Sequence, residues 1–214
     1  QRQMCIRDRI YIEAITILQS MSFFDNTKIA GWAFFIIGIL MIISAIMDIW
    51  NGAGATGSLS DNAGYVVAGI GSLIAAILYF LFGNKVRNGT ISAKIDVLGN
   101  YVRIVGVTTV IINLFALIGY AVVGETALAT FVVWIILGII IAWIGGKVND
   151  GKTTNFDKIL WIILLIIFVI LFIGSLLGIG GDVVDIVKAI CYAIVYLFMI
   201  IFMFDEDVRK KMGI

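Results

Sequence analysis

Few side chains in this chain could do chemistry, and the most isolated of them is Asn113. It lies within a long apolar run, one helical turn beyond Thr109 and close to Thr108. An amide in an apolar environment needs a partner, and such a bond between helices contributes on the order of 0.6–2 kcal/mol. These residues predict either an interhelical hydrogen bond that fixes packing or a polar lining for a solute or water path.

A second group of polar residues is charged. Asp182, Asp185 and Lys188 lie at the start of the last apolar run, and Asp48 lies at the end of the first. Asp185 and Lys188 are three residues apart and can pair on one helical face. Acidic residues at a helix N-terminus also interact favourably with the helix dipole. The group indicates either topology and helix capping or an access site for a cation or proton at the outer surface.

Most catalytic chemistry is excluded by composition. The chain has no histidine, which removes the commonest general base and metal ligand. Residues 146–153 match the phosphate-binding pattern GxxxxGK[ST], but that loop needs a preceding strand and a following helix in an α/β domain. Here a long apolar run precedes it. The net charge of +1 does not favour a nucleic-acid surface. We expect no enzyme, nucleotide, metal or cofactor.

The elements that carry these residues are predicted to be membrane helices. Hydrophobic residues make up 62% of the 214 residues, charged residues 14%, and the mean hydropathy is +1.11. About 20 apolar residues suffice to cross a bilayer as a helix. Six such runs predict an all-α bundle within residues 21–207, with helices at about 30–50, 64–82, 102–123, 127–145, 159–179 and 184–204.

The basic residues predict the orientation of the bundle. Of the 15 Lys and Arg residues, three lie in the first 20 residues, and all the others except Lys188 lie on one predicted side. The positive-inside rule makes that side cytoplasmic, so both ends of a multi-pass cell-membrane protein are expected there, including a charged tail at 205–214. Trp32, Tyr79 and Tyr101 are predicted to anchor the inner boundary at headgroup level.

The first 20 residues are expected to lie outside the natural protein. Residues 4–9 resemble a translated sequencing-adapter end, and Met21 is placed like a natural start just before the first apolar run. An alternative interpretation is an amphipathic interfacial helix over residues 10–24, although its polar face has few basic residues.

The chain also shows signs of internal repetition. Residues 83–89 and 145–151 are similar, residues 204–209 are a weaker third copy, and Val86, Val148 and Val208 occupy matching positions. This predicts a two-helix hairpin used three times in parallel orientation. The alternative is that every inner boundary attracts Lys and Gly for topological reasons alone.

This layout of tandem hairpins with glycine-containing helices, such as Gly31–Gly38, resembles the HdeD-type family of small membrane proteins. The resemblance covers residues 28–207 and implies a role connected with acid resistance. It implies no functional residue. Members of that family tend to have Pro after the odd-numbered helices, whereas this chain has none.

Small residues at four-residue spacing predict the inner faces of the bundle. These stripes are Gly64, Ala68, Ser72 and Ala76; Gly138, Ala142 and Gly146; and Gly174 and Gly178. Small residues allow helix backbones to approach closely in a membrane. Packing within the chain is the preferred interpretation, and a dimerisation face is the alternative.

Together these features predict a non-enzymatic integral membrane protein, accessory or stress-associated, that acts through helix packing. One alternative is a small-solute or ion transporter or channel with a path near Asn113. Another is a subunit of a larger membrane complex. The expected partners are the lipid bilayer and either a second copy or another membrane protein. Abundant Ile, with Asn and Lys in the loops, suggests an AT-rich prokaryotic genome.

Overall fold

The computed structural model describes residues 26–54, 59–123, 128–180 and 183–214, and residues 1–20 lie outside this part. The described residues form helices only. Their bounds are α2 Thr27–Ala53, α3 Leu59–Arg87, α4 Lys94–Val123, α5 Ala129–Val148, α6 Asn155–Leu177, α7 Val183–Met203 and α8 Glu206–Met212. Helices α2 to α7 are long and apolar enough to cross a membrane, which confirms the predicted all-α membrane bundle.

Several helices extend past their predicted bounds because helical structure continues beyond the apolar runs. Helix α4 begins at Lys94, about two turns before the predicted start, and Lys94 Nζ forms an ion pair with Asp205 Oδ2 at 2.5 Å. The tail forms α8. Its first turn is capped by the Asp205 side chain, which accepts from the Asp207 backbone N–H, and its end is capped by Gly213 with φ +75°.

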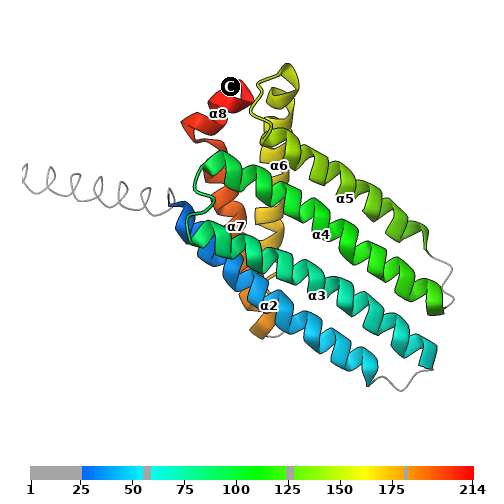
Figure 1. Ribbon diagram of the computed structural model, residues 1–214. Coiled ribbons are helices and arrows are strands. Elements are labelled where there is room, and N and C mark those ends of the chain that lie inside the picture. The colour runs from blue at the N-terminus through cyan, green and yellow to red at the C-terminus, as the bar shows by residue number, and fades with distance from the viewer. Residues whose placement is uncertain (1–25, 55–58, 124–127, 181–182) are drawn as a thin grey trace, which may run out of the picture.

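The membrane helices form a row and a separate pair. Figure 1 shows α2, α3, α4 and α5 side by side in chain order, with α6 and α7 set at an angle to them. Helix α7 contacts α2 and α4, whereas α6 packs mainly on α7. We call the end that carries α8 and the loops at 88–93 and 149–154 the basic end, because it holds most of the Lys and Arg residues.

Large buried side chains gather toward the basic end. At the other end large apolar side chains are exposed, including Trp50 and Leu177 at 79% and 82%. The two groups of helices therefore pack tightly at the basic end and separate away from it. The largest fully buried side chains are Phe34, Ile37, Leu98, Leu160, Phe198, Met199, Phe202, Met203 and Met212.

Glycine contacts hold the row together. A Cβ at Gly106 of α4 would overlap the backbone of Ala142 and Gly138 of α5, and one at Gly119 would overlap Gly64 of α3. The predicted faces at Gly138–Ala142 and Gly64 therefore do pack inside the chain.

Three small residues predicted to lie on inner faces do not contact another helix there. A Cβ at Gly146 or Gly174 would meet nothing within 4 Å, and one at Gly178 would meet only α6. The neighbouring Gly145 packs against α4 instead, because a Cβ there would overlap the backbone of Arg103 and Gly99.

The two similar loops share a backbone conformation. Gly89 and Gly151 have φ of +76° and +70°, in the left-handed region that favours glycine. Val86 and Val148, three residues earlier, are both fully buried, as is Val208 in α8. The matching positions thus have matching environments, although duplication of the hairpin stays a prediction.

Helix α8 is held against the loop between α5 and α6 by charged and polar contacts. Lys211 Nζ lies 3.3 Å from Asp150 Oδ1 and 3.8 Å from Asp157 Oδ2, and Thr153 Oγ1 donates to the Lys211 carbonyl at 3.0 Å. Lys147, in the pattern that matched a phosphate-binding loop, forms an ion pair with Asp150 at 3.2 Å.

We expect Gly106→Ala to lower the thermal unfolding midpoint in detergent and Gly146→Ala to leave it unchanged or raise it slightly. Alanine favours a helix over glycine by roughly 0.5–1 kcal/mol at both positions. Only at Gly106 does the added Cβ overlap a neighbouring backbone, and overpacking typically costs about 1–3 kcal/mol. Equal shifts for the two variants would contradict the packing described above.

We also expect Asp150 to stabilise the docked α8 in a pH-dependent way. The Lys152 backbone N–H, then Lys147 and Lys211, lower the pKa of Asp150 from 3.8 to about 2. Because the folded pKa is lowered, this stabilisation is present above about pH 4 and is lost as the pH falls through about 2. Wild type should have a higher unfolding midpoint than Asp150→Asn at pH 5, and the difference should shrink toward pH 2. A constant difference would contradict this.

Candidate functional site

A cavity of about 430 Å³ lies between the row of helices and the α6–α7 pair. Helices α3 to α7 all contribute to its lining, so the cavity exists because the pair crosses the row at an angle instead of joining it. None of its lining residues carries a charge. Its polar lining residues are Tyr79, Tyr101, Thr109, Tyr192 and Tyr196.

Two tyrosines form the deep wall of this cavity. Tyr79 and Tyr101 are only 7% and 2% exposed. The Tyr79 hydroxyl lies close to those of Thr108 and Tyr101, and the Tyr101 hydroxyl lies close to that of Tyr196. The prediction that Tyr79 and Tyr101 anchor the protein at headgroup level is therefore wrong, since both rings are enclosed within the bundle. Trp32, by contrast, is 51% exposed, as an interfacial ring would be.

The α7 side of the cavity carries the other two tyrosines. Tyr192 and Tyr196 are one helical turn apart, and their rings stack with centroids 6.1 Å apart and an interplanar angle of 16°. The Tyr192 hydroxyl donates to Met41 Sδ at 3.5 Å. Sequence reasoning missed this pair. The signal that could have found it is the four-residue spacing of two tyrosines in an otherwise apolar helix.

Apolar side chains that are also accessible from outside form the other side of the cavity. Trp134 of α5 and Ile167 and Leu171 of α6 line the cavity and are 49%, 42% and 40% exposed. Figure 1 shows α5 and α6 diverging from the loop that joins them, and these two helices make few contacts with each other. The cavity thus has an apolar opening between α5 and α6, at the level of the membrane.

The residues predicted to line a polar path are only partly brought together here. Thr109 lines the cavity, and Thr108 lies behind Tyr79. Asn113 is not among the lining residues. Its Nδ2 donates to the Thr109 carbonyl at 2.8 Å, so this amide donor is satisfied within α4 and not by another helix.

The predicted charge cluster is divided between two other cavities. Lys188 lines a cavity of about 470 Å³ between α6 and α7, which Tyr192 and Tyr196 also line. Asp48 lines one of about 390 Å³ between α2 and α3. Asp182 and the side chain of Asp185 lie outside the described part of the chain.

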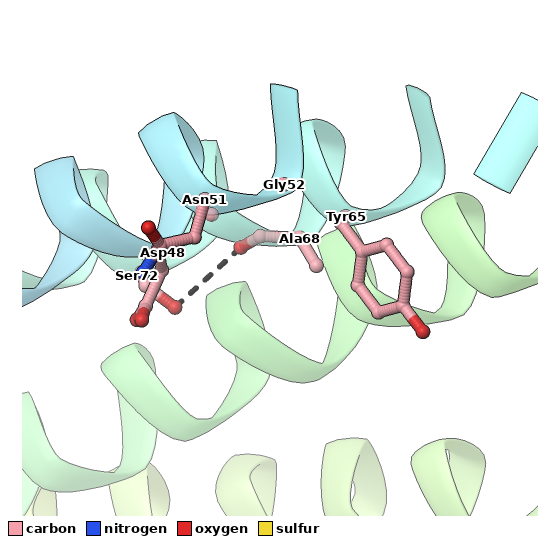
Figure 2. A pocket seen from close by; sticks show the side chains of 7 residues that line it. Asp48, Asn51, Gly52, Tyr65, Ala68 and Ser72 are labelled. Carbon is pink, nitrogen blue, oxygen red and sulfur yellow. Dashed lines mark hydrogen bonds between the residues drawn. The ribbon is translucent and has the colours of Figure 1, made fainter. Parts of the chain in front are cut away.

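The Asp48 cavity is a surface feature of the α2–α3 hairpin. Figure 2 shows Asp48 and Ser72 at one end of it and the Tyr65 ring extending away from them at the other. Ser72 Oγ donates to the Ala68 carbonyl at 3.5 Å. Because Asp48 and Tyr65 are both exposed, this pocket encloses a ligand less completely than the tyrosine-lined cavity does.

The tyrosine-lined cavity has the chemistry of a site for an uncharged molecule. Its walls are apolar or aromatic, and the polar groups that its side chains offer are hydroxyls and the indole N–H of Trp134. A charged group there would lose its hydration without gaining a counter-ion. A mainly apolar cavity with a few convergent polar groups is the usual form of a small-molecule site.

No protein-family model, curated protein or solved structure matches the chain, so its function has to be inferred from the sequence and the geometry.

Proposed function

We propose that this integral membrane protein is not an enzyme and that it binds an uncharged, lipid-soluble molecule in the tyrosine-lined cavity. The observation that carries this proposal is the combination of a buried hydroxyl wall, formed by Tyr79 and Tyr101, with an apolar opening between α5 and α6. A molecule with an apolar body and one small polar group matches both features.

The route to the cavity supports a ligand that comes from the bilayer. The exposed side chains Trp134, Ile167 and Leu171 are apolar, so a water-soluble molecule would gain little from them. A lipid-soluble molecule can exchange lipid contacts for protein contacts there at small cost. The site also lacks a charged group to recognise a phosphate or carboxylate.

We further propose that the basic end faces the cytoplasm of a prokaryotic cell, which the distribution of Lys and Arg supports. The protein would then act as an accessory or stress-associated protein, alone, as a homo-oligomer or within a larger membrane complex. The three hairpins remain the support for a relationship to HdeD-type proteins.

Filling the cavity tests the binding function. We expect Ile141→Trp to reduce binding of 1-tetradecanol at least about tenfold, because Ile141 lines the cavity and the larger ring would occupy it. Ile140→Trp is the matched control, since Ile140 is 46% exposed and does not line the cavity. Native mass spectrometry of the detergent-purified protein would count the adducts. Unchanged binding in Ile141→Trp, or equally good binding of tetradecanoate to wild type, would contradict the proposal.

A second candidate is transport of a small solute. It is favoured by the position of Tyr192 and Tyr196, which line both the central cavity and the cavity that contains Lys188. In liposomes, solute flux through the protein should fall in Asn113→Leu if the path continues past Thr109 to Asn113. Flux that survives this substitution intact would contradict that path.

A further inference from the structure

An arginine at the basic end of the α2–α3 hairpin is held in position by aromatic rings. Close packing of the two helices brings it there, because a Cβ at Gly31 of α2 would overlap the backbone of Arg87 in the last turn of α3. The Arg87 guanidinium carbon lies 4.5 Å from the ring centroid of Trp32 and 4.1 Å from that of Phe35. A cation within about 6 Å of an aromatic ring is attracted to its face, so Arg87 is held against α2.

A hydrogen bond within α3 also restrains Arg87. Its Nη2 donates to Asn84 Oδ1 at 2.8 Å, and Asn88 Nδ2 donates to the same oxygen at 3.2 Å. A guanidinium has five N–H donors, and among the described residues Arg87 forms no ion pair. Because the side chain is already restrained, binding an anion to its remaining donors costs little further conformational entropy.

A second cation lies beside this arginine. Lys28 is in the first turn of α2, one helical turn before Trp32, and its Cε would lie 3.4 Å from a Cβ at Gly89, two residues beyond Arg87. Lys28 is exposed, and it too forms no ion pair within the part of the chain that the structure describes. Trp32 is 51% exposed, as a ring at headgroup level would be. The hairpin thus presents two cations and an indole ring together.

The chemistry of this group matches a phosphate at the surface of the bilayer. A guanidinium can bind two phosphate oxygens through parallel N–H donors, and an ammonium adds a point charge. Basic pockets between membrane helices are suited to anionic lipid headgroups. One turn farther along α2 from Trp32, the side chain of Ile36 is exposed and can contact an acyl chain.

We propose that Lys28, Trp32 and Arg87 form a binding site for the headgroup of an anionic phospholipid. The phosphate would accept hydrogen bonds from Arg87, and Lys28 would add to the attraction. A zwitterionic headgroup carries the same phosphate, but its ammonium group would be repelled by the two cations. The site is separate from the tyrosine-lined cavity, and it does not depend on the binding function proposed for that cavity.

Native mass spectrometry of the detergent-purified protein can compare phosphatidylglycerol with phosphatidylcholine of the same acyl chains. Wild type should prefer phosphatidylglycerol, and Arg87→Gln should weaken its binding at least about tenfold, because hydrogen bonds to charged groups are lost. Arg87→Lys keeps the charge but lacks the planar pair of donors, so it should restore only part of the affinity. Arg103→Gln is the matched control: it removes the same charge from an exposed arginine of α4, beside Gly145 of α5, and should bind like wild type.

Three results would overturn the proposal. Equal weakening in Arg87→Gln and Arg103→Gln would mean that the lipid responds only to net charge. Equal affinity of wild type for the two lipids would remove the anionic preference, and inorganic phosphate bound as tightly as the lipid would identify a free anion as the ligand. Lys28→Gln guards against misfolding, since Lys28 is exposed. This variant should keep the unfolding midpoint of wild type and still bind phosphatidylglycerol more weakly, and unchanged binding would contradict the role of Lys28.

Discussion

Direct contact between helix backbones at glycine residues organises this bundle. Where a Cβ would overlap the neighbouring helix, as at Gly106 and Gly119, the helices approach closely and α2 to α5 line up in a row. In a membrane such contacts are an important source of association, because lipid tails are as apolar as the side chains they would replace. Helix α6 lacks them, since a Cβ added at Gly174 or Gly178 would meet no other helix within 4 Å.

The cavity follows from that difference. Helix α6 packs mainly on α7, and it meets the row through large side chains such as Phe168, whose ring centroid lies 6.1 Å from that of Tyr101 in α4. The space left between the two groups is lined by four tyrosines, whose hydroxyls lie close to one another. Polar groups in hydrocarbon need partners, which hydroxyl groups gathered in one cavity can provide.

At the basic end, the helices are held together by other kinds of contact. Here large buried side chains and the charged contacts of Lys211 and Lys94 hold α8 across the ends of the helices. Trp161 Nε1 also donates to the Met203 carbonyl at 2.8 Å, which joins α6 to the end of α7. The bundle is therefore tight where it meets the charged loops and more open toward the other end.

The amino-acid sequence by itself determined the six helices, because the length of an apolar run decides whether it can cross hydrocarbon. It also indicated the packed faces at Gly138 and Gly64, since small residues in a stripe permit close approach. It failed at Gly146 and Gly174, where the same residue type faces no neighbour. A stripe of small residues permits close approach of another helix, but whether a helix packs there depends on the arrangement of its neighbours.

Tertiary structure alone decided the site. Five tyrosines lie in similar apolar helices, yet only four of them meet in one cavity. Tyr65 is exposed, whereas the cavity is lined by Tyr79, Tyr101, Tyr192 and Tyr196. Their meeting depends on the angle at which α6 and α7 cross the row. That angle results from many side-chain contacts between segments far apart in the chain, and local patterns of hydrophobicity and spacing carry no information about it.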